Sequence, residues 1–396
     1  MEAGDDVRIH SILSALARRY RVLVFNLSST VEKPTLTFHN NLDSLAYISL
    51  PRRFYRLISK LTGWRQHYDL NPLMKLTQYI DELLTVLTLR YIVKKVNLLI
   101  VFGSMSLFSF MTRLVGNKKV IIVYDPLANY AQTLYLNSRR GLLKLLRYGL
   151  YLALHKLEIG ASDIVVYPSH VDLENARKMF RLRNTIIIPN PPPICYESIE
   201  EYSRLRTMRK DFDKPYFILL AGGRGKHNEE AVKMTIEIFN ELPPDKFRLF
   251  ITGPWQDIKK LVRNPSIYLV GIVSKERLKE LLAVSDYGLS PIFSHAAGTF
   301  LKVLAYIASG LGIVASPQSL QGIDTALLRT TKIFFVRSYE AYRNTILNIV
   351  LSSLKSKQSN EAGLVQKLVI LCSNVQDYLA AQLEMLIAGN QNAMDT

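Results

Sequence analysis

Small, hydroxyl-bearing and basic residues gather in one short stretch of the chain, where together they would hold an anion. Gly298 lets a phosphate approach the main chain closely, Thr299 offers a hydroxyl, and Lys302 follows as a mobile point charge. If a helix begins here, its first N–H groups and its dipole add partial positive charge at the same place. An ordinary turn before a helix, with a surface lysine, would account for the same residues.

The residues that follow predict the helix and the strand that position these groups. Leu301, Leu304 and Ile307 recur at helical spacing, and the pattern breaks at Gly310. Residues 312–315 then form a short apolar run without charge, as expected of a parallel strand that helices cover on both faces. The stretch 294–323 therefore predicts a loop, a helix, a tight turn and a buried strand of an α/β protein.

The segment GTFLKVLAYIASGLGIVAS, residues 298–316, resembles the signature of the GT-B glycosyltransferases of family 4, the glycosyl transferases group 1. The matching positions are Gly298, Thr299, Leu301, Lys302, Val303, Leu304, Ala308, Gly310, Val314 and Ala315. The resemblance implies two Rossmann-like domains whose parallel sheets face each other across a cleft. It assigns Gly298, Thr299 and Lys302 to the diphosphate of a nucleotide sugar. Two acidic positions of the family are alanines here: Ala305, where a glutamate usually holds the ribose, and Ala297.

A second glycine-rich loop follows another predicted strand. Residues 216–221 form an apolar run, and GGRGKHNEEAV comes next, ahead of a helix predicted from about Glu229. Gly223, Arg224 and Lys226 are therefore candidates for binding the same diphosphate, although a solvated loop has a similar composition. The family often has an arginine and a lysine in this loop.

Further candidate residues lie where other predicted strands end. The strand at residues 120–124 runs into YDPLANYAQ, and ligand chemistry collects at the carboxyl ends of parallel strands. Family members often have an acidic or histidine motif there that faces the sugar, so the resemblance assigns catalysis to Asp125, with a helix N-cap as the alternative. It also implies that the nucleotide base lies against the turn holding Gly271 and Val273. No metal or cofactor is implied, only the nucleotide diphosphate sugar as co-substrate.

The net charge of +17 is concentrated in the first half of the chain. Residues 1–200 hold 26 basic against 15 acidic residues, a net charge of +11, and the remainder holds 24 against 18, a net charge of +6. This excess favours an anionic partner. Because no RNA-binding motif or arginine-rich tail is present, we expect an anionic membrane surface and no nucleic acid. Basic and aromatic residues interleave between positions 52 and 65, which fits an interfacial helix or a solvated helix face.

Cysteine usage and hydropathy bear on the compartment. Cys195 and Cys372 lie far apart in the sequence and lack metal-ligand spacing, which favours reduced thiols. The apolar stretch at residues 97–112 is shorter than the about 20 residues that a membrane-spanning helix needs. The sequence also shows no signal peptide. We therefore expect a cytoplasmic protein, peripheral to the cytoplasmic face of a membrane.

The length of 396 residues suits two α/β domains. We expect an acceptor-side domain at residues 1–195, in which a helix at 7–19 comes first, so that the family's first strand is missing. A linker at 196–214 follows three consecutive prolines. The nucleotide-sugar-binding domain spans 215–370, and a final helix at 371–396 packs back on the first domain.

These features together predict a retaining glycosyltransferase that moves a sugar from a nucleotide diphosphate sugar to a lipid-linked or glycan acceptor. The alanine at position 305 also allows a catalytically weakened or inactive homologue that acts as a binding or scaffold partner. A nucleotide-sugar epimerase is a third alternative, because GT-B scaffolds serve that chemistry too. The paired acidic and histidine motifs of the epimerases are absent from this sequence.

Overall fold

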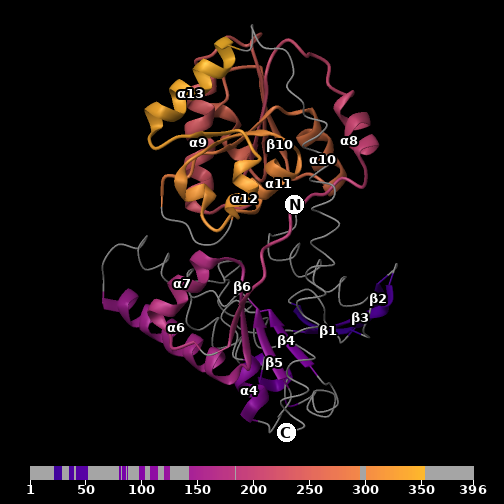
Figure 1. Cartoon of the computed structure of the whole chain (residues 1–396), viewed down its shortest axis with the longest axis vertical. Coiled ribbons are helices and arrows are strands. Elements are labelled where there is room, and N and C mark those ends of the chain that lie inside the picture. The colour runs from indigo at the N-terminus through magenta and orange to yellow at the C-terminus, as the bar shows by residue number, and fades with distance from the viewer. Residues whose placement is uncertain are drawn as a thin grey trace. The chain divides into compact units, whose positions relative to one another are not determined.

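The structure is a computed structural model of the chain and describes two compact units. The described residues are 22–28, 35–39, 42–51, 80–81, 83–85, 87, 98–102, 108–114, 120–124, 142–182, 184–294 and 300–352. The division between the units falls between Pro189 and Asn190. We call the described residues up to Pro189 the first unit and those from Asn190 the second unit (Figure 1).

The first unit contains two sheets. A parallel sheet has the order β4-β5-β6-β7, with β4 (Leu98–Phe102), β5 (Val120–Tyr124), β6 (Ile164–Tyr167) and β7 (Thr185–Ile187). A smaller sheet has the order β1-β3-β2, with β1 (Val22–Ser28), β2 (Thr35–His39) and β3 (Leu42–Pro51); β1 is parallel and β2 antiparallel to β3. Among the described residues, its helices include α4 (Phe108–Leu114), α6 (Leu142–Ala161) and α7 (His170–Met179). The predicted strand at 120–124 is confirmed as β5.

A buried carboxylate of α6 holds the start of α4. Glu158 accepts hydrogen bonds from the Ser109 hydroxyl at 2.7 Å, the Ser109 amide at 3.3 Å and the Phe110 amide at 3.5 Å. It thereby satisfies N–H groups that have no partner inside the helix. Arg113 at the end of α4 pairs with Asp163 at 2.5 Å, just before β6. These contacts join α4 to α6 and β6, and they give Glu158 and Asp163 structural roles.

Replacing Glu158 with glutamine should destabilise the first unit, because the amide group places N–H donors against the N–H groups of α4. We expect a loss of about 1 to 3 kcal/mol in the free energy of unfolding. Glu174→Gln is the matched control, since Glu174 pairs with Arg177 at an exposed position of α7 and should lose less than about 0.5 kcal/mol. Urea denaturation measures both. Equal midpoints for the two variants would contradict the role of Glu158.

The second unit is a six-stranded parallel sheet in the order β10-β9-β8-β11-β12-β13. Its strands are β8 (Tyr216–Leu220), β9 (Arg248–Thr252), β10 (Ile267–Gly271), β11 (Tyr287–Ser290), β12 (Gly312–Ala315) and β13 (Ile333–Phe335). Counted along the chain, these strands follow the order 3-2-1-4-5-6 of the Rossmann fold, which reverses direction between β8 and β11. The strands predicted at 216–221 and 312–315 are confirmed as β8 and β12.

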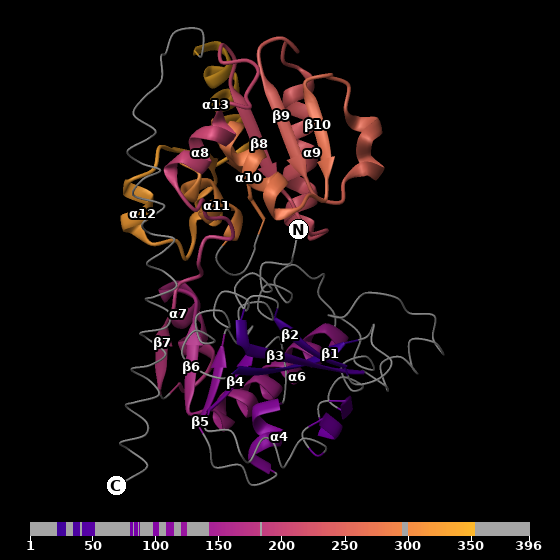
Figure 2. The same cartoon turned by 90° about the vertical axis from the view of Figure 1, so that its right-hand side faces the viewer.

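Helices cover both faces of this sheet (Figures 1 and 2). They are α8 (Ile199–Arg206), α9 (Lys226–Asn240), α10 (Lys275–Val284), α11 (Leu301–Ala308), α12 (Thr325–Arg329) and α13 (Tyr339–Ser352), with 3-10 turns η1 (Gln256–Leu261) and η2 (Pro317–Leu320). One core cluster packs α9 and α13 on the sheet around Phe217 and Leu249. The other packs α10 and α11 around Ile218 and Ile313. Successive residues of β8 thus face opposite helical layers, as in any sheet buried on both sides.

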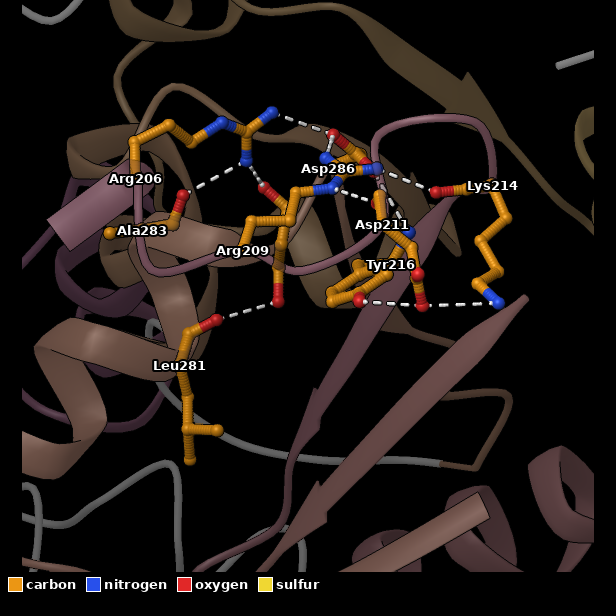
Figure 3. A network of polar contacts seen from close by, with 9 residues as sticks. Arg206, Arg209, Asp211, Lys214, Tyr216, Leu281, Ala283 and Asp286 are labelled. Atoms are coloured by element: carbon orange, nitrogen blue, oxygen red, sulfur yellow. Dashed lines mark hydrogen bonds and ion pairs between the residues drawn. The ribbon is translucent and has the colours of Figure 1, made fainter. Parts of the chain in front are cut away.

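The segment predicted as a linker, residues 196–214, is folded onto the second unit. Helix α8 packs Tyr202 and Leu205 against Ala283 of α10. Figure 3 shows the polar contacts that follow: Arg206 and Arg209 both pair with Asp286, at 2.7 and 2.5 Å. The prediction failed here because a charged stretch after prolines resembles a solvated spacer, whereas these arginines are largely buried on one carboxylate.

The structure bears on two expectations about the cellular environment of the protein. Cys195 is disulfide-bonded, so the prediction of a reduced thiol is wrong at this position. Within the described ranges, no helix has both the length and the apolar character that crossing a membrane requires. The predicted helices at 7–19 and 371–396 lie outside the described residues.

Candidate functional site

The order of the strands in the second unit marks one place for a ligand. In open α/β sheets, ligands bind at the carboxyl ends of the strands where the strand order reverses. Here that point lies between β8 and β11. The loop after β8 leads into α9, and the loop after β11 leads into α11. The starts of α9 and α11 therefore lie at the same edge of the sheet.

Helix α9 begins at this edge without a side-chain cap. Its N-cap is Gly225, and it starts at Lys226, three residues before the start predicted at Glu229. The amides of Asn228 and Glu229 bond to the Gly225 carbonyl. Among the described residues, no side-chain group caps the first turn. The positive end of a 15-residue helix is thus available to an anion.

Lys302 joins the first turn of α11 to the first turn of α9. Its ammonium group donates to the side-chain oxygen of Asn228 at 2.7 Å. The amide nitrogen of Asn228 donates in turn to the Gly223 carbonyl at 3.0 Å. Lys302 is half-buried, and its burial lowers its pKa from 10.5 to about 7. An anion bound here would favour the charged form and restore the pKa.

One aromatic ring lies beside this lysine, and a second ring packs against the first. The Phe300 ring lies 5.7 Å from the Lys302 ammonium and 5.8 Å from the His227 ring. Burial and, secondly, the charge of Lys302 lower the pKa of His227 to about 4. His227 is therefore neutral at physiological pH, and Lys302 is the residue of this group that can carry the positive charge.

The structure does not bring Arg224 and Lys226 to this lysine. Both guanidinium nitrogens of Arg224 pair with Asp257, at 2.8 and 2.7 Å, and the group lies 5.1 Å from the Trp255 ring. The Lys226 side chain is 72% exposed and pairs with Glu230 at 3.6 Å. Of the predicted diphosphate ligands among the described residues, only Gly223 and Lys302 are joined, through Asn228. Gly298, Thr299 and Asp125 lie outside the described residues.

The predicted base-binding turn lies at the same edge of the sheet. Gly271 ends β10 with φ of +82°, a conformation that favours glycine. Its carbonyl accepts from the Gly253 amide at 2.8 Å. Val273 is half-buried, and Ile272 between them exposes 67% of its surface. An apolar side chain so exposed beside this turn is suited to contact with a flat apolar ligand.

A tyrosine that the sequence analysis did not single out separates the strands at the reversal point. The Tyr306 hydroxyl accepts from the Leu220 amide at 2.9 Å and donates to the Leu289 carbonyl at 3.0 Å. Strands β8 and β11 pair only before this point, at Tyr287 with Phe217 and at Gly288 with Ile218. Burial raises the pKa of Tyr306 well above its usual value, so it remains a neutral spacer. The gap it fills depends on Gly288, where an added Cβ would lie 2.3 Å from its ring.

Buried oxygens without partners also lie at this edge. In the second unit, within residues 190–294 and 300–352, they are Thr252 Oγ1, Ser290 Oγ and Gln318 Oε1. Thr252 ends β9, Ser290 ends β11, and Gln318 follows β12. Buried polar atoms are usually hydrogen-bonded, and exceptions mark water or ligand sites. Ala305, where the family has its glutamate, is fully buried in the cluster of α10 and α11. Among the described residues, no three His, Cys, Asp or Glu side chains gather as metal ligands.

Binding of a nucleoside diphosphate should weaken as the pH rises above about 7, because Lys302 must then take up a proton to meet the phosphates. Affinity should fall by up to about tenfold per pH unit until the pKa of the bound state is reached. Calorimetric titration with UDP, GDP or ADP between pH 7 and 9 tests this. Lys302→Arg is the matched control: a guanidinium stays charged, so its affinity should change little with pH. A parent profile as flat as that of Lys302→Arg would contradict the expectation.

Solved structures with the same arrangement of strands define the class of fold. Sucrose-phosphate synthase from Thermosynechococcus elongatus is similar over 99% of this chain and 94% of its own, with a TM-score of 0.70 and 14% identity. An Escherichia coli structure described as trehalose-6-phosphate bound with UDP-2-fluoro glucose covers 96% and 95%, with a TM-score of 0.65 and 12% identity. WaaG, a glycosyltransferase involved in lipopolysaccharide biosynthesis, covers 98% and 96%, with a TM-score of 0.62 and 14% identity. The chain has the GT-B fold of these proteins, and the predicted fold class is confirmed.

The second unit also matches a sequence family. Residues 216–351 match the family model described as Glycosyl transferases group 1, from β8 to the last turn of α13. The predicted resemblance to this family is confirmed for these residues. No curated protein sequence matches the chain significantly.

Proposed function

We propose that this chain is a retaining glycosyltransferase that moves a sugar from a nucleotide diphosphate sugar to a lipid-linked or glycan acceptor. The observation that carries the proposal is the half-buried Lys302, held between the starts of α9 and α11 where the strand order reverses. The match of residues 216–351 to Glycosyl transferases group 1 and the GT-B fold support it. UDP-2-fluoro glucose bound to a structural relative supports a nucleotide sugar as the donor.

In the proposed sugar transfer, the second unit must stabilise a leaving diphosphate. The bond between the anomeric carbon of the sugar and the diphosphate oxygen breaks, the acceptor oxygen bonds to that carbon on the same face, and the proton of the acceptor hydroxyl passes to the leaving diphosphate. Negative charge grows on the diphosphate as it leaves. The Lys302 ammonium would stabilise this charge with its positive charge, and the N–H groups at the start of α9 would stabilise it with preorganised dipoles. Asp125, in the first unit, remains the proposed residue facing the sugar.

Turnover of nucleotide sugars tests the proposal directly. The protein is incubated with UDP-, GDP- and ADP-sugars, with and without total cell lipid or glycan as the acceptor, and release of the nucleoside diphosphate is followed. Slow hydrolysis of one donor, accelerated by the acceptor fraction, is the expected result. Failure of all three donors to bind or turn over would overturn the proposal.

A binding or scaffold role is the second candidate, and Ala305 is the observation that favours it. Without a carboxylate there, the ribose hydroxyls lose a charged acceptor worth roughly 1.5 to 3 kcal/mol. Ala305 is fully buried, so a glutamate at this position would have to leave the apolar cluster to reach a ligand. A parent protein that binds a nucleoside diphosphate but neither hydrolyses nor transfers the sugar would support the scaffold role.

We further propose that the protein acts at the cytoplasmic face of an anionic membrane. The net charge of +11 in residues 1–200 supports this, since each basic residue near such a surface contributes on the order of 1 kcal/mol. The interleaved stretch at 52–65 lies outside the described residues. Flotation with vesicles of anionic phospholipid should carry the protein upward at low salt and release it at high salt. If the protein does not float at low salt, the proposal fails.

A further inference from the structure

Asn228 occupies an unusual place in the group around Lys302. It is the third residue of α9, and only 8% of its surface is exposed. Its two side-chain atoms contact two different elements: the oxygen accepts from Lys302 of α11, and the nitrogen donates to the carbonyl of Gly223, after β8. Short side chains at helix starts usually bond to the backbone of their own helix. Asn228 instead bridges the two loops that flank the reversal point.

The orientation of the Asn228 amide follows from these two partners. A lysine ammonium only donates and a carbonyl only accepts, so the oxygen must face Lys302 and the nitrogen must face Gly223. Gly223 thereby fixes the side chain that fixes Lys302. The bond to Asn228 uses one of the three ammonium donors, and no other partner of the remaining two appears among the described residues.

Lysine needs such support more than arginine would. Its ammonium is a point charge on a flexible four-carbon stem, whereas the planar guanidinium of arginine is preorganised for its hydrogen bonds. A hydrogen bond of 2.7 Å that the ammonium donates to a buried amide oxygen fixes it before any ligand arrives. A neutral amide does this without cancelling the positive charge, whereas a carboxylate in the same place would neutralise it.

We propose that Asn228 is a positioning residue for donor binding: it holds the Lys302 ammonium toward the diphosphate at the start of α9 and acts only through that lysine. The inference rests on the proposed function, because the diphosphate is the ligand that Lys302 is expected to meet. The base, the ribose and the sugar are not contacted by Asn228. Nucleosides without phosphate should therefore bind independently of this residue.

A double-mutant cycle tests this dependence. Asn228→Ala, Lys302→Ala and the double variant are titrated calorimetrically with whichever of UDP, GDP and ADP the parent binds most tightly, and with the corresponding nucleoside. Asn228→Ala should weaken diphosphate binding by about fivefold to tenfold and leave nucleoside binding within about twofold. In the Lys302→Ala background the same change should have no further effect. Unchanged nucleoside affinity also shows that each variant has kept the fold of the site.

Asn228→Asp provides a second, independent test. The carboxylate keeps the contact with Lys302 but neutralises its charge, so diphosphate binding should weaken more than in Asn228→Ala. Diphosphate affinity in Asn228→Asp equal to that of the parent would overturn the inference, as would additive effects in the cycle or a parallel loss of nucleoside affinity. Each of these outcomes leaves the proposed function standing. A parent protein that binds no nucleoside diphosphate would overturn both the inference and the proposed function, so the two failures are distinguishable.

Discussion

Replacing Lys302 with alanine should weaken the binding of a nucleoside diphosphate by about 1.5 to 3 kcal/mol, roughly tenfold to more than a hundredfold. The reason is the loss of the charge-assisted contact between its ammonium and the phosphates. The structure places this ammonium beside the uncapped start of α9, joined to Gly223 through Asn228. Calorimetric titration of parent and variant at pH 7 measures the change.

Lys226→Ala is the matched control for this experiment. Lys226 is the first residue of α9, but its ammonium is largely exposed and pairs with Glu230. An exposed ion pair contributes little, so the control should bind within about twofold of the parent. If both variants lost affinity equally, general attraction between basic residues and the ligand would explain the result, and the specific role of Lys302 would fall.

Replacing Gly253 with alanine should cost at least about 3 kcal/mol of the free energy of unfolding. Gly253 has φ of +114°, and an added Cβ would lie 2.0 Å from the Ala221 carbonyl oxygen and 2.7 Å from the Trp255 indole nitrogen. The same approach lets Trp255 donate to Ala221 at 2.7 Å and lets the Gly253 amide bond to Gly271 at 2.8 Å. The clash therefore acts on backbone that joins the ends of β8, β9 and β10.

Thermal denaturation, followed through the unfolding transition of the second unit, measures this loss of stability. Gly223→Ala is the control, because a Cβ there meets only the Asn228 amide at 3.9 Å and its φ is not in the left-handed region. It should change the free energy of unfolding by less than about 0.5 kcal/mol. A Gly253→Ala protein as stable as this control would mean that the two strand ends do not approach as described.

Most strands of both units could be predicted because their residues satisfy one local rule. Residues 98–102, 120–124, 164–167 and 312–315 are apolar runs that end in turns, and a strand buried on both faces needs little else. The start of α9 was missed by three residues, since Gly225, Lys226 and His227 resemble a loop in composition. The order of the strands, and hence the reversal point, depends on pairing between distant segments and is not visible in any local pattern.

The residues of the candidate site likewise divide into those that a local sequence pattern predicts and those that depend on distant parts of the chain. Lys302 was predicted from a motif, because its helix start and its charge lie within a few residues of each other. Arg224 has the charge and the position in the sequence that a diphosphate ligand needs, but its guanidinium group pairs with Asp257. Asn228 and Tyr306 could not be found from the sequence. Asn228 acts through Lys302, which lies more than 70 residues further along the chain, and Tyr306 bonds to the backbone of two strands, β8 and β11. A polar residue in the first turn after a glycine loop was the only local signal for Asn228.

The central claim is that the second unit binds a nucleoside diphosphate through its phosphates at the start of α9. Calorimetric titration of the parent protein with UDP, GDP and ADP, each beside its own nucleoside, tests it most directly. We predict that at least one diphosphate binds, and that it binds at least about tenfold more tightly than its nucleoside, as one charge-assisted contact to the phosphates requires. Binding of no diphosphate, or equal affinity for the diphosphate and the nucleoside, would contradict the claim.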